Sequence, residues 1–201
     1  MNKIAIYGGT FNPIHNGHIN LCNGCQQLYN FDKIVLIPTN IPPHKNAVDL
    51  ASNIDRFNML KLAVSNIANF EVSDIEFKLG AKSYTINTIL ELKNQHLDAE
   101  FYLIIGSDML RIFQEWHRYE DVLKEVTLVV GARHEAEFDE LLTIKSHFGS
   151  LSMKIDIVNI NVVDVSSTDI REKLSKNESI SKLVNYRVED YINKNHLYTN
   201  L

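Results

Sequence analysis

The sequence predicts an α/β protein with a doubly wound, mainly parallel β-sheet, helices on both faces of the sheet, and a helical C-terminal tail. The first observation behind this prediction is that short apolar runs such as IAIY, IVLI and YLII are nearly continuous, which is typical of strands buried on both faces. The second is that segments with helical periodicity separate these runs, as in right-handed strand–helix–strand units. The third is that two helical patterns close the chain with no clear strand between them.

The predicted strands and helices alternate along most of the chain. Strands are expected where apolar residues cluster, at 3–7, 33–37, 70–75, 101–105, 126–130 and 154–160. Helices are expected at 17–29, 52–66, 83–95, 118–124 and 135–148, and in the tail at 167–174 and 183–193. The sequence contains no internal repeat, low-complexity segment or linker. We therefore expect a single domain over residues 1–201, with a helical C-terminal part from about residue 166.

The composition excludes several classes of protein. Hydrophobic residues make up 45% of the 201 residues, as in a globular protein with a core, and the net charge of −5 argues against a general nucleic-acid-binding protein. No window approaches the ~18 apolar residues of a membrane span, and the N-terminus lacks the apolar stretch of a signal peptide. Cys22 and Cys25 are the only cysteines, so no disulfide framework is implied. We expect a cytoplasmic protein without nucleic-acid or membrane partners.

Four of the predicted strands are followed by residues suited to ligand binding. The segments are GGTFNPIHNGH after the first strand, PTNIPPHK after the second, GSDML after the fourth and GARHE after the fifth. In sheets of this type, ligands bind outside the carboxyl ends of the strands. The four segments are therefore expected to converge on one pocket.

The segment GGTFNPIHNGH has the chemistry of an anion site. Gly8 and Gly9 allow the backbone to approach a ligand closely, and a helix is expected to begin near Gly17 with free backbone N–H groups. His15 and His18, three residues apart, can lie on one side of its first turn, where they suit a polyphosphate. The spacing fits neither a G-x-G-x-x-G nor a Walker A motif. Taken alone, each histidine is more often an ordinary surface residue, and no ligand set for a zinc site is found nearby.

The complete segment resembles the (H/T)-x-G-H signature of the nucleotidyltransferase superfamily. Four further motifs follow in the family's order over nearly the whole chain: the first three resemble bacterial nicotinate-nucleotide adenylyltransferases in particular, and the fourth resembles a motif shared across the superfamily. They are PTNIPPHK at 38–45, SYT at 83–85, GSD at 106–108 with Trp116, and SSTDIR at 166–171. One departure is Asn12, where the family more often has Asp. This residue serves the turn, so we expect little functional consequence.

This resemblance implies a Rossmann-like fold and transfer of the AMP part of ATP to nicotinate mononucleotide, giving deamido-NAD and pyrophosphate. It implies Mg²⁺ with ATP as co-substrate, without a dedicated protein metal site. His18, His15 and Arg171 are then the catalytic residues. The implied ATP-binding residues are Gly8, Gly9, Thr10, Phe11, His15, His18, Gly106, Asp108, Ser166, Ser167, Thr168 and Arg171. The implied residues for the pyridine nucleotide are Asn40, His44, Lys45, Tyr84, Thr85, Trp116 and His117.

Alternatives remain open at this point. The acceptor of the same chemistry could be nicotinamide mononucleotide or phosphopantetheine, and the chain could be a non-catalytic nucleotide-binding module that kept the fold. Trp116, the only tryptophan, stacks on the pyridine ring by the resemblance but could equally be a half-buried packing residue. The C-x-x-C at 22–25 lies inside a predicted helix rather than at its start, which favours packing cysteines over a redox pair. The sequence does not decide between a monomer and a homo-oligomer.

Overall fold

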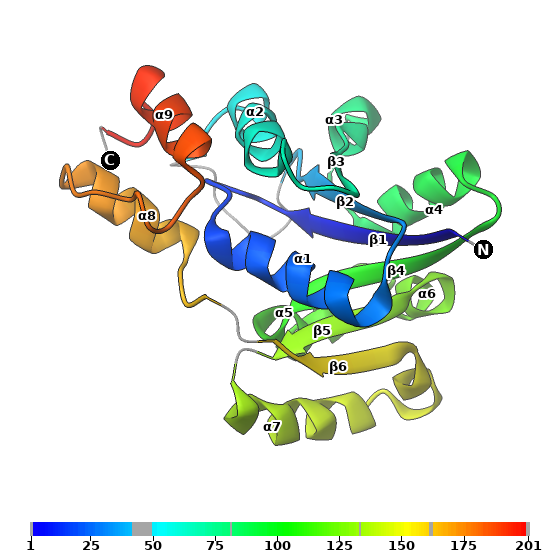
Figure 1. Cartoon of the computed structure of the whole chain (residues 1–201). Helices are drawn as coiled ribbons and strands as arrows, with labels where there is room; N and C mark the ends of the chain where they lie inside the picture. Colours follow the sequence, from blue (N-terminus) through cyan, green and yellow to red (C-terminus); the bar gives the residue numbers. More distant parts are fainter. Residues whose placement is uncertain (1, 42–49, 81, 133, 161–162, 200–201) are drawn as a thin grey trace.

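The computed structural model describes residues 2–41, 50–80, 82–132, 134–160 and 163–199. Its centre is a six-stranded sheet in the order β3-β2-β1-β4-β5-β6, in which every neighbouring pair is parallel. The strands are β1 (Asn2–Gly9), β2 (Lys33–Pro38), β3 (Phe70–Val72), β4 (Ala99–Gly106), β5 (Thr127–Ala132) and β6 (Ile155–Asn159). This order confirms the predicted doubly wound, Rossmann-like α/β fold (Figure 1).

Each predicted helix is present within a few residues of its expected bounds. The long helices are α1 (Asn16–Tyr29), α2 (Asn53–Val64), α4 (Thr85–Gln95), α6 (Tyr119–Glu125), α7 (Glu135–Ser146), α8 (Ser167–Ser175) and α9 (Tyr186–Lys194). The sequence missed the short helices α3 (Ile75–Leu79) and α5 (Ser107–Arg111), and the short 3-10 segments at 113–115 and 149–154. The strand predicted at 70–75 ends at Val72, because Ile75 begins α3. Helices of one or two turns contain too few residues to show a helical period.

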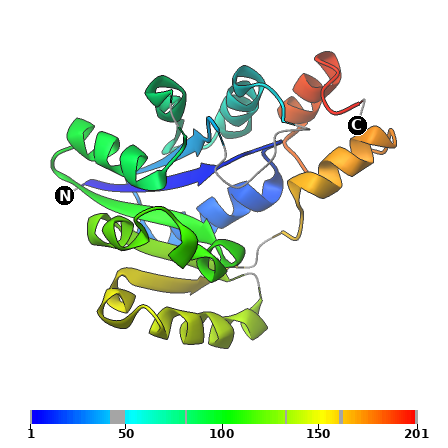
Figure 2. The same cartoon turned by 180° about the vertical axis from the view of Figure 1, so that it is seen from behind.

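The two faces of the sheet are covered by different helices. On β1, Ala5 and Tyr7 belong to one apolar cluster, while Ile4 and Ile6 belong to the other. Helices α1, α2, α8 and α9 supply the first cluster, and α4, α6 and α7 supply the second (Figures 1 and 2). Side chains of a strand point in turn to one face of the sheet and then to the other. Because both faces are buried, both sets of side chains are apolar. This explains the continuous apolar runs in the sequence.

The winding direction of the sheet reverses between β1 and β4. From β1 the chain builds outward through β2 to β3, and then returns to place β4 on the other side of β1. A crevice forms at such a switch point, outside the carboxyl ends of the two central strands. Gly8 and Gly9 end β1 there, and Gly106 ends β4.

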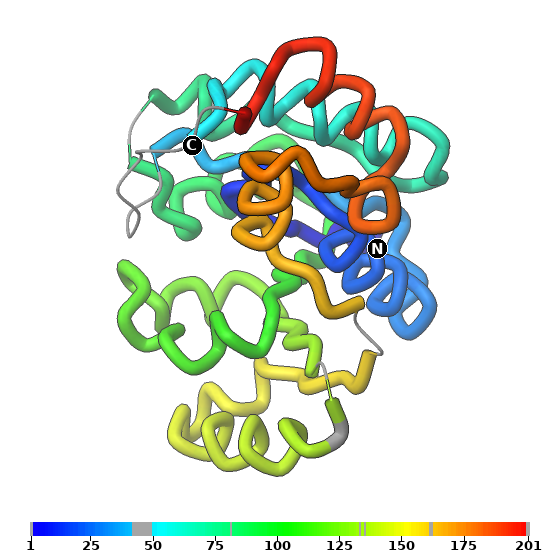
Figure 3. The backbone as a smooth tube through the Cα atoms, turned by 90° about the vertical axis from the view of Figure 1, so that its left-hand side faces the viewer, coloured from blue at the N-terminus to red at the C-terminus, as the bar shows by residue number. Residues whose placement is uncertain are grey.

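The helical tail returns to the N-terminal half of the molecule. Helix α9 packs along α2, and α8 lies near the start of α1 (Figure 3). The hydroxyl of Tyr191 on α9 donates to Asp55 Oδ1 at 2.9 Å and accepts from Asn58 Nδ2 at 3.0 Å. Ile170, Val188 and other tail residues are buried in the same core as α1 and α2. Over the described ranges, no helix has both the length and the apolar character needed to cross a membrane.

Candidate active site

A cavity of about 850 Å³ lies at the carboxyl edge of the sheet. Its walls include residues at the carboxyl ends of four strands: Gly9 at the end of β1, Thr39 directly after β2, Gly106 at the end of β4 and Gly131 near the end of β5. The volume lies within the range of cavities that hold small molecules and cofactors. The switch point of the sheet and the segments singled out in the sequence therefore meet at one place.

Most of the predicted site residues line this cavity. From the predicted ATP site these are Gly8, Gly9, Thr10, His15, His18, Gly106, Asp108, Ser166, Ser167, Thr168 and Arg171. From the predicted pyridine-nucleotide site they are Tyr84, Thr85, Trp116 and His117. Phe11 is buried behind the wall, and Asn40 lies beside the cavity, where its backbone N–H donates to Ser83 Oγ at 2.9 Å. His44 and Lys45 lie outside the described residues.

The two histidines form a pair at the start of α1. His15 is the N-cap residue and His18 is the third helical residue, so the rings stack with their centroids 3.6 Å apart. The backbone N–H of His15 donates to Nδ1 of His18 at 3.2 Å. Because Nδ1 accepts this bond, the proton of the neutral His18 ring lies on Nε2. His18 can thus donate through Nε2 to an anion at the helix N-terminus.

Phe11 supports the ring of His18 from behind. Phe11 has a positive φ of 49°, and its ring packs edge-on against His18 with 5.1 Å between centroids. A Cβ on Gly9 would come within 2.9 Å of the Phe11 ring, so a side chain at this position would displace it. Around Gly8, by contrast, an added Cβ would meet nothing within 4 Å. The two glycines therefore differ in what they allow. Gly9 leaves room for the ring of Phe11, and Gly8 leaves open space in which a ligand can lie.

Helix α8 is joined by hydrogen bonds to the histidine loop, the segment 10–15 between β1 and α1. Arg171 Nη1 donates to the backbone carbonyl of Asn12 at 2.8 Å, and Ser167 Oγ donates to the carbonyl of Pro13 at 2.9 Å. Ser166 and Asp169 form a capping box at the helix start. The hydroxyls of Ser166 and Ser167 are thus engaged with protein groups in this conformation. The backbone N–H groups in the first turn of α8 remain suited to a phosphate, as at any helix N-terminus.

Arg56 is a buried residue of this region that the sequence analysis did not identify. Its side chain is 0% exposed and donates to the carbonyls of Thr10 at 2.9 Å, Thr39 at 2.7 Å and Ala51 at 3.2 Å. These carbonyls belong to the loop after β1, the loop after β2 and the segment before α2. The nitrogen that donates to Thr39, Nη2, also donates to Asn53 Oδ1. Arg56 therefore fixes two cavity loops relative to each other.

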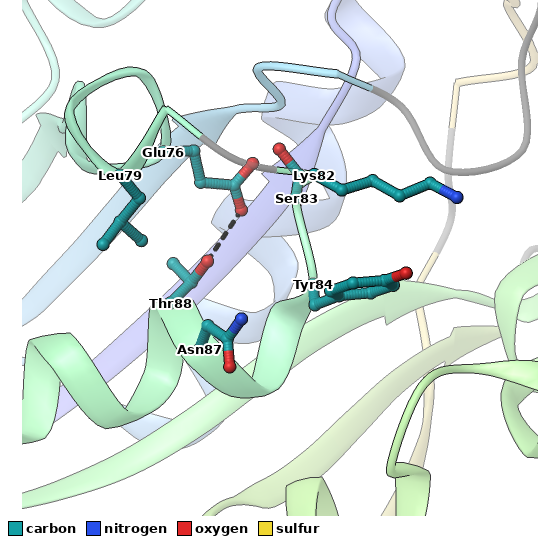
Figure 4. A pocket seen from close by; sticks show the side chains of 7 residues that line it. All are labelled: Glu76, Leu79, Lys82, Ser83, Tyr84, Asn87 and Thr88. Atoms are coloured by element: carbon teal, nitrogen blue, oxygen red, sulfur yellow. Dashed lines mark hydrogen bonds between the residues drawn. The ribbon is translucent and has the colours of Figure 1, made fainter.

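A buried carboxylate compensates the charge of Arg56. Glu76 lines a side pocket of about 170 Å³, where Thr88 Oγ1 donates to its Oε1 at 2.9 Å (Figure 4). Burial raises the pKa of Glu76 above its ordinary value, while Ser83, Thr88 and the charge of Arg56 act in the opposite direction. Burial lowers the pKa of Arg56, and Glu76 opposes that shift. The two charges together connect α2, α3 and the first turns of α4 beneath the cavity.

Gly106 and Asp108 form a close-fitting corner at the end of β4. Asp108 lies in the first turn of α5 and lines the cavity. A Cβ on Gly106 would lie 2.6 Å from Asp108 Oδ1, so any larger residue would displace the carboxylate. This geometry gives a physical reason for the sequence G-S-D at this strand end.

Aromatic rings form the opposite wall of the cavity. The rings of Tyr84 and His117 lie with centroids 4.3 Å apart and an interplanar angle of 34°. Trp116 is half-buried and packs against Phe113 with 5.0 Å between centroids. Trp116 therefore has a packing contact on one side and lines the cavity on the other. This placement is compatible with both roles considered from the sequence, stacking on a pyridine ring and packing within the protein.

The two cysteines lie on the buried face of α1. Both are free thiols with 0% exposure in the core cluster that α1 shares with the sheet. Burial raises the pKa of both thiols, that of Cys25 to about 12. A thiol held protonated is a poor nucleophile and a poor metal ligand. The C-x-x-C is thus a packing element of the helix that carries the histidine pair.

Comparison with known proteins identifies relatives of the whole chain. The model of the cytidylyltransferase-like family matches residues 6–173. A probable nicotinate-nucleotide adenylyltransferase of Caldicellulosiruptor saccharolyticus is 37% identical, covering 98% of this chain and 98% of its own length. A probable enzyme of the same name from Clostridium tetani is 38% identical, covering 98% of this chain and all of its own.

Solved structures share the fold. The nicotinic acid mononucleotide adenylyltransferase of Plasmodium falciparum, complexed with NaAD, superposes with a TM-score of 0.82 at 24% identity, over 98% of each chain. A putative nicotinate-nucleotide adenylyltransferase from Vibrio parahaemolyticus superposes with a TM-score of 0.73 at 21% identity. The alignment covers 100% of this chain and 98% of the Vibrio chain. At these identities, the superpositions establish the arrangement of strands and helices.

Proposed function

The chain belongs to the cytidylyltransferase-like family, and from this premise we propose that it transfers AMP from ATP to nicotinate mononucleotide, giving deamido-NAD and pyrophosphate. The observation that carries this proposal is the cavity at the switch point. One wall presents the His15–His18 pair at the N-terminus of α1 together with the N-terminus of α8, and the other presents aromatic rings at the start of α4. The first wall suits phosphates and the second suits a pyridine ring.

The reaction requires positioning rather than a strong base. The second pKa of a phosphate monoester is about 6, so the phosphate of the acceptor is largely ionised at neutral pH. One of its oxygens forms a bond to the α-phosphorus of ATP, and the bond from that phosphorus to the bridging oxygen breaks. Pyrophosphate leaves with the electron pair. Charge neutralisation and alignment at the α-phosphate then supply most of the catalysis.

The phosphate wall contains the groups for this task. His18 donates from Nε2 to an α-phosphate oxygen, and the stacked His15 provides a second imidazole beside it. Arg171, held against the Asn12 carbonyl, supplies positive charge at the start of α8 for the pyrophosphate part. Thr10 and the first turn of α8 offer backbone N–H groups, and Asp108 can accept from a ribose hydroxyl.

The aromatic wall favours the acid form of the pyridine nucleotide. Thr85 is the first residue of α4, and Tyr84 caps the helix without a side-chain hydrogen bond. The first N–H groups of a helix have no intrahelical acceptor, and the helix dipole favours an anion there. A carboxylate gains more from this environment than a neutral carboxamide does. Trp116, which lines the same wall, can stack on the pyridine ring.

Mg²⁺ enters this proposal as part of the Mg·ATP substrate. Within the described ranges, no three His, Cys, Asp or Glu side chains gather where they could hold a metal ion. Mg²⁺ prefers phosphate oxygens and water as ligands, so the triphosphate can carry it into the cavity. Because ATP is available in the cytoplasm, we propose that the reaction takes place there.

The test is pyrophosphate release from Mg·ATP with nicotinate mononucleotide, nicotinamide mononucleotide and phosphopantetheine offered in parallel. We expect a strong preference for nicotinate mononucleotide. Preference for another acceptor would keep the adenylyl transfer but contradict the role given to the α4 N-terminus. A folded protein that binds ATP and releases no pyrophosphate with any of the three would contradict the proposed function.

A further inference from the structure

Tyr198 lies close to the C-terminus, yet its side chain reaches the loop that carries the histidine pair. Its hydroxyl donates to Asn12 Oδ1 at 2.7 Å, and the ring is only 8% exposed. The same Oδ1 accepts the backbone N–H of Ala51 at 3.0 Å. The backbone carbonyl of Asn12 accepts from Arg171. Residue 12 therefore connects the C-terminal tail, the segment before α2 and helix α8.

The backbone of the tail is bent to bring this ring inward. Tyr198 has a positive φ of 65°, and His196 has one of 50°. Such conformations are uncommon for residues other than glycine, and they persist where surrounding contacts hold them. The buried ring belongs to the core cluster that includes Phe11 and Ile14 of the histidine loop. Burial of the ring and its hydrogen bond to Asn12 act together with hydrogen bonds within the tail, such as that from the Leu197 N–H to the Ile192 carbonyl at 3.1 Å, to hold the turn.

The Tyr198 hydroxyl remains a donor throughout the pH range of activity assays. Burial raises its pKa above the ordinary value, and the nearby charges of Arg171 and Arg56 act in the opposite direction with smaller effect. The Oδ1 atom of Asn12 is an amide oxygen, and it accepts hydrogen bonds from the Tyr198 hydroxyl and the Ala51 N–H. A carboxylate oxygen would accept both bonds equally well, which agrees with the expectation that Asn in place of Asp has little consequence here.

We propose that Tyr198 is a positioning residue for adenylyl transfer: its hydrogen bond to Asn12 fixes the loop that presents His15 and His18 to the α-phosphate. This inference rests on the proposed function. It assigns to the tail a part in aligning the phosphate wall rather than in binding the pyridine nucleotide. Misplacement of reacting groups by about 1 Å can cost up to about a hundredfold in rate. Loss of one hydrogen bond to Oδ1, with that from Ala51 retained, should cost less than that.

The variant Tyr198→Phe removes the hydroxyl and leaves the ring. Its matched control is Tyr191→Phe, which removes the bonds of another tail tyrosine that end on Asp55 and Asn58 of α2 rather than on Asn12. We expect Tyr198→Phe to lower kcat about tenfold while the KM for nicotinate mononucleotide stays within about twofold of wild type. We expect Tyr191→Phe to keep the wild-type kcat, even if its Tm falls as far as the Tm of Tyr198→Phe does. An unchanged kcat in Tyr198→Phe, or equal losses in both variants, would overturn the proposal.

A second measurement does not depend on turnover. Hydrogen exchange followed by mass spectrometry reports on backbone amides in a peptide covering residues 9–18. We expect exchange in this peptide to be about fivefold faster in Tyr198→Phe and unchanged in Tyr191→Phe. If the wild type releases no pyrophosphate, the proposed function fails. The exchange comparison still decides whether Tyr198 fixes the histidine loop. Equal exchange rates in wild type and Tyr198→Phe would overturn that role.

Discussion

The two walls of the cavity are built by different kinds of contact. On the phosphate wall, directional hydrogen bonds from Arg56, Arg171, Ser167 and Tyr198 end on backbone or side-chain oxygens of the histidine loop and its neighbours. The aromatic wall is assembled mainly from ring contacts, such as those of Tyr84 with His117 and of Trp116 with Phe113. Hydrogen bonds fix position to a few tenths of an ångström, whereas ring contacts tolerate sliding and rotation.

This difference matches the tasks proposed for the two walls. Charge develops on phosphate oxygens during the transfer, and donors help most when they are already in place. A pyridine ring must enter and leave, so a wall of rings that can adjust suits it better. Substitutions on the phosphate wall should therefore act mainly on kcat, and those on the aromatic wall mainly on the KM of one substrate.

The largest effect is expected from His18→Ala. It removes the Nε2 donor that we propose for the α-phosphate, so kcat should fall by about 10²–10³-fold, as for other groups that stabilise developing charge. ATP affinity, measured by calorimetry, should change far less. His147→Ala is the control, since His147 is an exposed residue at the end of α7 and outside the cavity lining. Turnover at the wild-type rate in His18→Ala would show that the pair is not catalytic.

The next effect tests the aromatic wall. Trp116→Ala should raise the KM for nicotinate mononucleotide about tenfold, because stacking of an aromatic side chain on a base contributes about 1–3 kcal/mol. The KM for ATP should stay close to the wild-type value. Trp116→Phe retains a ring and should recover most of the loss. Equal increases for both substrates would mean that Trp116 supports the fold of the cavity rather than the pyridine ring.

Much of this arrangement could be predicted from the sequence, and the reasons are local. Continuous apolar runs indicate doubly buried strands, and the spacing of His15 and His18 places both rings on the first turn of α1. The burial of Arg56 could also have been predicted from the sequence. Arg56 precedes Met59, Leu60 and Ala63 by three, four and seven residues, and this spacing places it on the buried apolar face of α2. An arginine on such a face must find acceptors.

The partners of Arg56 and Tyr198 had no local signal. The three carbonyls around Arg56 come from separate segments near residues 10, 39 and 51, and only the folded chain brings them together. Tyr198 contacts a residue 186 positions away in the sequence. Ser167 was expected to meet a phosphate, whereas its hydroxyl donates to Pro13 in this conformation. Sequence patterns identify which groups are available, and tertiary packing decides which of them are already engaged.

A smaller effect is expected from His117→Ala. His117 is exposed and stacks on Tyr84 at the edge of the aromatic wall, so its loss removes one side of a ring contact worth about 0.5–1 kcal/mol. The KM for nicotinate mononucleotide should rise about two- to fivefold with kcat nearly unchanged. His134→Ala, at the exposed start of α7, is the matched control. A large fall in kcat would place His117 with the phosphate wall and would contradict the division between the two walls.

The smallest effect on catalysis, and the sharpest test of rigidity, concerns the thiols beneath the histidine pair. Cys22 and Cys25 are buried on α1, and their pKa values are raised, so the native protein at pH 8 should react with a thiol reagent at least a hundredfold more slowly than the protein in urea. Activity should be unchanged after this exposure to the reagent. Rapid modification of the native protein would mean that α1 opens readily, and the phosphate wall would then be no more rigid than the aromatic one.

The same burial makes stability depend on alkaline pH in a defined direction. The folded state keeps the proton of Cys25 up to about pH 12, whereas the unfolded chain loses it near the ordinary value of 9.0. The folded state thus binds more protons between these values, and the free energy of unfolding falls as pH rises, by up to about 1.4 kcal/mol per pH unit for one thiol. Urea titrations at pH 8, 9.5 and 10.5 should show a shallower decline for Cys25→Ala than for the wild type, despite its lower stability at pH 8. Identical slopes would mean that the Cys25 thiol is solvated in the folded protein, contrary to a tightly packed α1.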